Sequence, residues 1–325
     1  MNTLSDQPLI THLFTADPSA HVFNGRLYLY PSHDRETLIP PNENGDQFDM
    51  VDYHVFSLDS IGGPVTDHGV ALALEDIPWA SRQLWAPDAA RKGETYYLYF
   101  PARDKEGLFR IGVAVSSVPE GPFTPEPEPI AGSYSIDPCC FVDDDGQAYL
   151  YFGGIWGGQL QCWTSGHFDP EGQEPSGDVP ALMPRVARLG ADRKSFAGEI
   201  RTLPILDAEG QPLHADDHDR RFFEAAWVHK REGIYYFSYS TGDTHYLVYA
   251  TADNPLGPFT YRGRILEPVI GWTTHHSIVE FQGKWYLFYH DASLSGGITH
   301  LRCVKVREIF YGADGTILPV SIPAD

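Results

Sequence analysis

The chain has 325 residues, of which 44 are acidic and 23 are basic, so its formal net charge at pH 7 is −21. Such a surface repels phosphate backbones and anionic lipid headgroups, which argues against nucleic-acid and membrane-surface binding. No run of about 18 apolar residues is present, so no membrane-spanning helix is expected. The first residues lack a signal-peptide pattern, so we expect a cytoplasmic protein. The four cysteines show no CxxC spacing, and reduced thiols are expected.

A repeat of strand, glycine turn and aromatic strand runs along the whole chain. The second strands read RLYLY after Gly25, ETYYLYF after Gly93, QAYLYF after Gly146, IYYFSYS after Gly233 and KWYLFYH after Gly283. Aromatic residues favour strands, and a glycine turn between two such runs predicts a hairpin. Two of the units also share a motif after a third strand. It reads PEGPFTPE (119–126) in one unit and PLGPFTYRG (255–263) in the other.

Each unit therefore supplies about four strands, which is typical of one propeller blade. We predict an all-β chain in which residues 1–325 form a single domain, a five-bladed β-propeller. The longest interval between strands, 163–221, is expected to hold the outer strands of blade 3 and a long loop.

The residue that opens the innermost strand of each blade faces the central channel of a propeller. Counting back eight or nine residues from each turn glycine gives Asp17, Trp85, Asp137, Glu224 and His275. Three carboxylates, a tryptophan and a histidine at equivalent positions predict a functional site. The alternatives are turn residues for the two aspartates, which precede proline, and core residues for the tryptophan and the histidine.

Carboxylates that face one another across an aromatic-walled pocket suit glycoside hydrolysis. One acid protonates the leaving oxygen, while a second carboxylate activates water or attacks the sugar. A third carboxylate near the acid raises its pKa, because like charges in a low dielectric resist joint ionisation. Trp85 offers an apolar platform for one face of a sugar. A neutral glycan needs no electrostatic steering and is therefore compatible with the negative charge.

The segments TADPSAHVFNGRLYLY, WAPDAARKGETYYLYF, SIDPCCFVDDDGQAYLYFGG, FFEAAWVHKREGIYYFSYSTG and HHSIVEFQGKWYLFYH resemble glycoside hydrolase family 43. The resemblance spans nearly the whole chain and implies a five-bladed propeller that hydrolyses glycosides with inversion. It implies that Asp17 is the general base and that Glu224 is the general acid. It implies further that Asp137 raises the pKa of the acid and orients it.

The resemblance also assigns residues to substrate and metal. Trp85 matches a substrate-lining tryptophan, and Arg302 in HLRCV matches an arginine near the sugar subsite. Many family members carry calcium or another cation on the channel axis, bound through water and one histidine. That histidine matches His275, or His276 if the register is off by one. No organic cofactor is implied.

The implied substrates are short arabinose- or xylose-containing oligosaccharides, from which terminal L-arabinofuranosyl or D-xylosyl units are removed. Two alternatives remain open: an endo-arabinanase or galactanase on the same fold, and a non-catalytic carbohydrate-binding propeller. The presence of all three carboxylates favours an enzyme. The sequence leaves open the oligomeric state and the choice between arabinofuranosidase and xylosidase.

Overall fold

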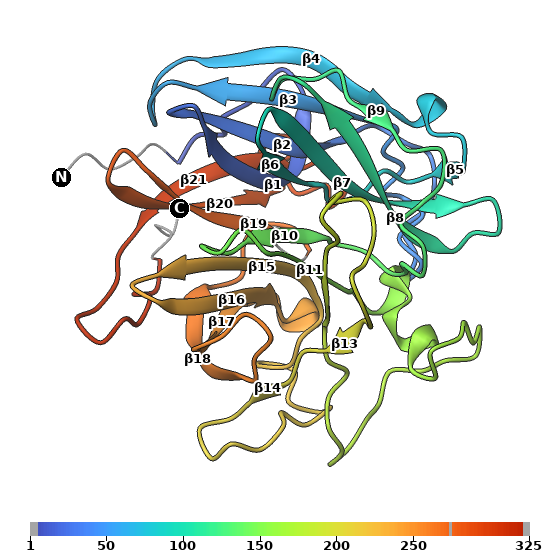
Figure 1. The fold of residues 1–325 in the computed structure, drawn as a ribbon, viewed down its shortest axis with the longest axis vertical. Helices are drawn as coiled ribbons and strands as arrows, with labels where there is room; N and C mark the ends of the chain where they lie inside the picture. Colours follow the sequence, from blue (N-terminus) through green and yellow to red (C-terminus); the bar gives the residue numbers. More distant parts are fainter. Residues whose placement is uncertain (1–5, 273–274, 321–325) are drawn as a thin grey trace.

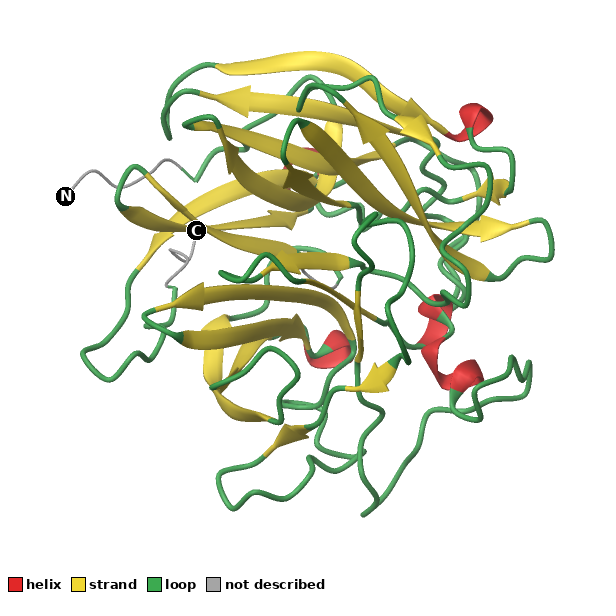
Figure 2. Ribbon diagram, viewed as in Figure 1, coloured by secondary structure: helices red, strands yellow, loops and turns green. Residues whose placement is uncertain are grey.

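The computed structural model describes residues 6–272 and 275–320 of the chain. The ends of the predicted domain, 1–5 and 321–325, and residues 273–274 lie outside the described residues. The described part contains strands β1 to β21 and only short 3₁₀ helices of three or four residues. The strands form five sheets arranged around a common axis (Figures 1 and 2), as the repeat predicted. No helix in the described part is long and apolar enough to cross a membrane.

The sheets close into a ring through their innermost strands. These strands are β1 (Phe14–Phe23), β6 (Asp88–Lys92), β10 (Cys139–Val142), β15 (Glu224–Arg231) and β19 (His276–Phe281). Each strand contacts the next in this order, and β19 returns to contact β1. Five blades around one axis therefore confirm the predicted all-β, five-bladed propeller, with the first and last blades adjacent (Figure 1).

Each innermost strand pairs antiparallel with the aromatic strand that follows its glycine turn. The five turn glycines have φ between +60° and +82°, a conformation that glycine adopts without steric cost. The aromatic strands are β2 (Arg26–Asp34), β7 (Thr95–Asp104), β11 (Ala148–Phe152), β16 (Ile234–Ser240) and β20 (Lys284–Asp291).

The remaining strands extend the blades outward unequally. Blade 1 adds β3 (Asp52–Leu58) and β4 (Val65–Ala73); blade 2 adds β5 (Ala80–Arg82), β8 (Phe109–Ser116) and β9 (Thr124–Pro125); blade 3 adds β12 (Arg185–Arg188) and β13 (Arg201–Thr202); blade 4 adds β17 (Leu247–Ala252), β18 (Phe259–Leu266) and β14 (Ile205–Leu206); blade 5 adds β21 (Cys303–Ile309). Blade 5 therefore has three strands in the described part, whereas blades 2 and 4 have five.

Two non-local contacts shape blades 4 and 5. Strand β14 comes from the long interval assigned to blade 3, but it pairs in parallel with β18 of blade 4. The three-stranded blade 5 has its outer strand β21 covered by the start of the chain. There the Leu9 N–H donates to the Val304 carbonyl, and the Thr15 N–H donates to the Arg302 carbonyl. The N-terminal segment thus ties the last blade to the first.

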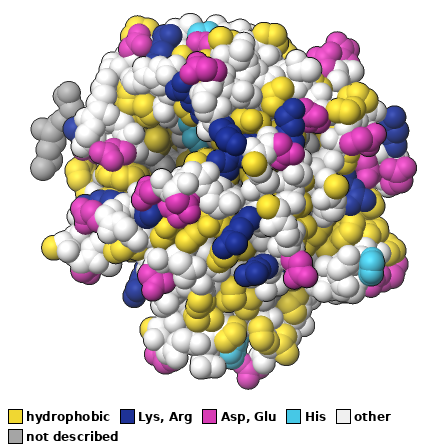
Figure 3. Space-filling model, viewed as in Figure 1, with side chains coloured by type: hydrophobic (Ala, Val, Ile, Leu, Met, Phe, Trp, Pro, Cys, Tyr) yellow, Lys and Arg dark blue, Asp and Glu magenta, His cyan; other side chains and the backbone are white. Residues whose placement is uncertain are grey.

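The aromatic strands fill the space between neighbouring blades. Each contributes a tyrosine that is less than 2% exposed: Tyr30, Tyr99, Tyr151, Tyr236 and Tyr289. All four cysteines are buried and free, as expected for reduced thiols. On the surface, acidic and basic groups lie interspersed on the face in Figure 3.

Candidate active site

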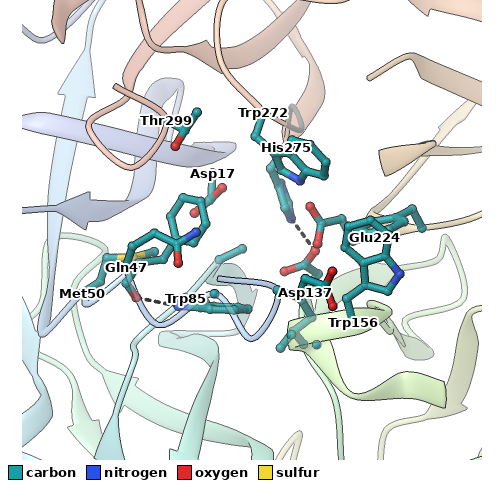
Figure 4. A pocket seen from close by; sticks show the side chains of 18 of the residues that line it. Asp17, Gln47, Met50, Trp85, Asp137, Trp156, Glu224, Trp272, His275 and Thr299 are labelled. Carbon is teal, nitrogen blue, oxygen red and sulfur yellow. Dashed lines mark hydrogen bonds and ion pairs between the residues drawn. The ribbon is translucent and has the colours of Figure 1, made fainter. Parts of the chain in front are cut away.

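A cavity of about 460 Å³ lies where the blades converge. Its lining includes all six residues singled out from the sequence, namely Asp17, Trp85, Asp137, Glu224, His275 and Arg302. Figure 4 shows the three carboxylates and His275 directed into this space from different blades. Residues separated by up to 285 positions in the chain, Asp17 and Arg302, are in direct contact here.

Irregular backbone aims the carboxylates into the cavity. Strand pairing shifts register between Ala16 and Ser19, around Asp17, and again immediately after Glu224. Such bulges bend a strand and redirect its side chains. Asp17 and Asp137 have φ of 51° and 56°, in the left-handed region that aspartate adopts more readily than most residues. Asp17 thus lies within β1, at a bulge rather than in an ordinary turn.

Asp17 is surrounded by donors that favour its ionised form. Nη1 of Arg302 donates to its Oδ1 at 3.0 Å, and Nη2 donates to its Oδ2 at 3.3 Å. The Ser32 hydroxyl donates to Oδ2 at 2.5 Å. Burial by itself raises the pKa of Asp17, but Arg302, His290 and His275 outweigh burial and lower that pKa below its ordinary value. Asp17 is therefore a carboxylate held ionised in a buried site.

Asp34 holds the guanidinium that binds Asp17. Its Oδ2 accepts from Nε of Arg302 at 2.8 Å and from the Arg302 backbone N–H at 2.9 Å, while Oδ1 accepts from Nη2 at 2.7 Å. Its side chain is fully buried. Arg302 is thereby fixed between two carboxylates, a geometry that the planar guanidinium suits and an ammonium does not.

Asp137 has the opposite electrostatic character. Burial, then the nearby Glu224 and Asp17, raise the pKa of Asp137 well above its ordinary value. The Ala225 N–H donates to its Oδ2 at 2.7 Å, which ties Asp137 to the residue directly after Glu224. One side of the cavity therefore favours a carboxylate, and the other favours a retained proton. This separation is characteristic of a base and acid pair.

Aromatic side chains form the walls. The Trp85 ring packs on Phe109 at a centroid distance of 4.6 Å, and its Nε1 donates to the Phe48 carbonyl at 2.8 Å. Gly45, with φ of 73°, passes so close that an added Cβ would lie 2.7 Å from the Trp85 ring. Trp156 and Trp272, also in the lining, have ring centroids 6.1 Å apart. Flat apolar walls of this kind suit sugar faces.

A buried arginine anchors two segments of the wall. Arg103 donates through Nη2 to the Asn44 side chain at 2.8 Å and to the Gly157 carbonyl at 3.3 Å. Its Nε donates to Gln83 at 2.6 Å. Arg103 thus joins the segment 42–48 to the turn 156–158, and both segments line the cavity.

Four of these supporting residues, Ser32, Asp34, Arg103 and His290, were not predicted from the sequence. Ser32 and His290 carry a signal, because each stands seven residues after a turn glycine, where the second strand of its blade passes the site. Nothing in the local sequence distinguishes Asp34 or Arg103. Their importance comes from contacts with residues 268 and 59 positions away.

Substituting lysine for Arg302 tests the electrostatic account of Asp17. An ammonium group makes fewer of these contacts than the guanidinium, so we expect the pKa of Asp17 to rise. Activity that needs ionised Asp17 is lost as the pH falls through that pKa. The acidic limb of kcat/KM against pH therefore moves to higher pH. Arg262→Lys, at an exposed arginine, should leave the limb in place; an unmoved limb in Arg302→Lys contradicts the assignment.

His275 can offer a cation one ligand. Its side chain is buried, and Nε2 has no hydrogen-bond partner among the described residues, at 3.8 Å from Oδ2 of Asp137. Nδ1 accepts the His276 N–H at 2.9 Å, so the neutral ring carries its proton on Nε2. Ligation by Nε2 therefore requires that proton to move. Because calcium prefers six to eight oxygen ligands, a calcium ion held by this one nitrogen would keep water ligands.

His276 does not fit the cation role as an alternative. It is fully buried, and its Nε2 lies 2.6 Å from the Ser238 hydroxyl. It is absent from the cavity lining, which includes His275. Counting back eight residues from the turn glycine Gly283 therefore selects the histidine that lines the cavity, His275.

Comparison with known proteins identifies a family and the same fold. A family model described as "Glycosyl hydrolases family 43" matches residues 7–317. "Xylosidase/arabinosidase 43A" of Humicola insolens is 71% identical over 320 residues, covering 96% of this chain and 98% of the relative. "Beta-xylosidase" of Xylanibacter ruminicola is 54% identical over 311 residues, covering 94% of this chain and 97% of the relative.

Similar solved structures superpose on this chain over nearly its full length. A family 43 beta-xylosidase/alpha-arabinofuranosidase from a compost microbial metagenome, in complex with xylotriose and described as calcium-free, has a TM-score of 0.95 and 65% identity. The alignment covers 97% of this chain and 96% of that one. A family 43 enzyme from Xanthomonas citri, complexed with xylotriose, has a TM-score of 0.93 and 57% identity, covering 98% and 94%.

Proposed function

The chain belongs to glycosyl hydrolases family 43, and from this membership and the cavity we propose that it removes terminal D-xylosyl or L-arabinofuranosyl units from short oligosaccharides with inversion. The observation that carries the mechanism is the electrostatic division of the cavity. Arg302 keeps Asp17 ionised, whereas Asp137 and Glu224 lie together where ionisation of both is unfavourable. The enzyme is a glycoside hydrolase.

In the proposed reaction, ionised Asp17 is the general base. Its carboxylate takes a proton from the attacking water, which adds to the anomeric carbon from the face opposite the leaving group. Ser32 and Arg302 fix the orientation of this carboxylate. The guanidinium also resists premature protonation of the base, so water activation continues at mildly acidic pH.

Glu224 is the proposed general acid. Burial and the nearby Glu224 and Asp17 raise the pKa of Asp137, although the bond from the Ala225 N–H opposes this rise, so the pair of Asp137 and Glu224 resists joint ionisation and retains a proton. We assign the transfer of that proton to Glu224, because the family resemblance gives this residue the role of the acid. Glu224 gives that proton to the glycosidic oxygen as the bond breaks, and Asp137 keeps the acid in position through the adjacent backbone.

Several observations support a short, neutral pentoside as substrate. The cavity volume of about 460 Å³ lies in the usual range for small-ligand pockets. Trp85, Trp156 and Trp272 offer flat apolar surfaces beside the carboxylates. The names of the similar proteins specify xylosidase or arabinosidase activity, and two of the similar solved enzymes hold xylotriose. We therefore propose that Trp85 packs against the sugar and that Arg302 lies near the terminal sugar unit.

The experiment that tests this function is a substrate panel. We expect p-nitrophenol release from p-nitrophenyl β-D-xylopyranoside or p-nitrophenyl α-L-arabinofuranoside. We also expect release of single pentoses from xylobiose and arabinobiose. Release of oligosaccharides from debranched arabinan or galactan, with no action on the aryl pentosides, would favour an endo-acting enzyme. Binding of xylotriose without turnover of any of these substrates would favour a carbohydrate-binding propeller.

We propose further that a cation, calcium in the first instance, binds at His275 and supplies positive charge beside the carboxylates. Chelator treatment should then lower the activity of the wild-type enzyme, and added Ca²⁺ should restore it. His275→Ala should show the lowered activity without chelator and no response to Ca²⁺. The exposed-histidine control His167→Ala should behave as wild type. Full Ca²⁺ activation of His275→Ala would contradict this site.

A further inference from the structure

A cluster of histidines and aspartates lies in blade 1 outside the cavity lining. Within the described residues, one group of three metal-ligating side chains comes close enough to share an ion, and its members are His33, Asp52 and His54. One donor atom of each lies within 4.8 Å of the others. None of the three lines the cavity that contains Asp17.

Strand geometry explains why these side chains meet. Successive side chains of a strand point to opposite faces. On β2, Ser32 and Asp34 contact Asp17 and Arg302, so His33 between them faces the other way. Ser32 pairs with Tyr53 of β3, which sets Asp52 and His54 beside His33 on the shared face. The two imidazole rings are 5.1 Å apart between centroids.

The hydrogen bonds prepare the cluster for metal binding in two ways. His33 Nδ1 lies 2.6 Å from Oδ1 of Asp52, so an ion held by both residues would take the place of the ring proton between these two atoms. His54 Nδ1 lies 3.2 Å from Oδ1 of Asp67, and this carboxylate holds the ring proton of His54 on Nδ1 and leaves the lone pair of Nε2 available. Metal-binding histidines commonly donate their other N–H to a carboxylate in this way. His275 differs, because its Nδ1 accepts a backbone N–H.

The cluster is also accessible to an ion from solvent. The side chains of His33, Asp52 and His54 are 21%, 20% and 14% exposed. A site with three protein ligands and an open position for water is common for zinc. Imidazole nitrogens favour zinc and its neighbours among the transition metals, whereas calcium takes oxygen ligands.

We propose that His33, Asp52 and His54 form a transition-metal site, with Zn²⁺ as the expected ion, separate from the cation site proposed at His275. The ion joins β2 to β3 and completes its coordination with water. Asp67 supports the site by orienting His54. Because Ser32 and Asp34 flank His33, a bound ion restrains the strand that carries two supports of Asp17. The proposal does not depend on which glycoside the enzyme hydrolyses.

Calorimetric titration of ZnCl₂ into untagged, chelator-treated full-length enzyme tests the site. We expect one Zn²⁺ per chain in the wild type and a raised melting temperature with Zn²⁺. His33→Gln and His54→Gln should each weaken Zn²⁺ binding by about tenfold or more, since even losing a supporting group typically costs that much. His275→Ala and His167→Gln should retain the wild-type stoichiometry and affinity for Zn²⁺.

Two further measurements keep the result interpretable. Circular dichroism of each metal-free variant reports whether it folds; if the glutamine variants do not, Asp52→Asn replaces them, with the same expected loss of Zn²⁺ affinity. Co²⁺ bound at the site should give visible absorption bands that His54→Gln removes. Undiminished Zn²⁺ binding in folded His33→Gln and His54→Gln, or loss of binding in His167→Gln to the same extent, would overturn the proposal.

Discussion

Asp17→Asn is expected to lower kcat on every glycoside substrate by about a thousandfold or more, as loss of a general base does. Asparagine keeps the size of the side chain but has no carboxylate to accept a proton from water. The loss should be as large for p-nitrophenyl xyloside as for xylobiose, because base catalysis acts on water and not on the leaving group. Steady-state kinetics on both substrates measures this.

The control for Asp17→Asn is Asp253→Asn, at an exposed aspartate away from the cavity lining. It should leave kcat unchanged. Xylotriose should still bind to Asp17→Asn when titrated by calorimetry, which separates loss of chemistry from loss of the site. An Asp17→Asn variant that folds and keeps a substantial part of wild-type turnover would refute the assignment of the base.

Glu224→Gln is expected to affect substrates unequally. Xylobiose has a poor leaving group that requires protonation, so its turnover should fall by about a hundredfold to ten-thousandfold. A dinitrophenyl xyloside leaves as a stabilised anion and should lose much less. The ratio of kcat/KM for the two substrates, compared between variant and wild type, measures the need for an acid.

The matched control is Glu280→Gln, because Glu280 also lies on an innermost strand but is not part of the active-site cavity. It should change neither rate. An equal fall on xylobiose and on the dinitrophenyl glycoside would show that Glu224 has another role, since a general acid matters least when the leaving group is good.

The fold was predictable because the repeat is local. A glycine turn and the aromatic strand after it are encoded within about ten residues, and five copies were sufficient to count the blades. The same register placed Asp17, Asp137 and Glu224 in one cavity lining. Their roles stay predictions until the variants are measured.

The features that could not be predicted from the sequence depend on contacts between distant parts of the chain. The strand β14 joins blade 4 although the sequence preceding it belongs to blade 3. Likewise, the carboxylate of Asp34 matters through Arg302, 268 positions away. No local pattern encodes these contacts, because each joins segments that lie far apart in the chain. The electrostatic difference between Asp17 and Asp137 has the same origin: both are buried aspartates before proline, and only their tertiary partners distinguish them.

A few of the acidic residues that give the chain its negative charge have specific places in the active site. Four of the chain's 44 acidic residues line the active-site cavity, namely Asp17, Glu43, Asp137 and Glu224, and a fifth, Asp34, holds the arginine that keeps Asp17 ionised. Acidic composition alone indicated only which partners to exclude. The chemistry depends on a few carboxylates whose surroundings differ.

Inversion at the anomeric carbon is the most direct consequence of placing a base and an acid on opposite sides of the sugar. Proton NMR of the first product released from a β-D-xyloside measures it, provided spectra are recorded before the free sugar mutarotates. The proposed mechanism predicts that α-D-xylose appears first and that the β anomer grows later. Initial release of β-D-xylose would contradict the mechanism and indicate a covalent intermediate.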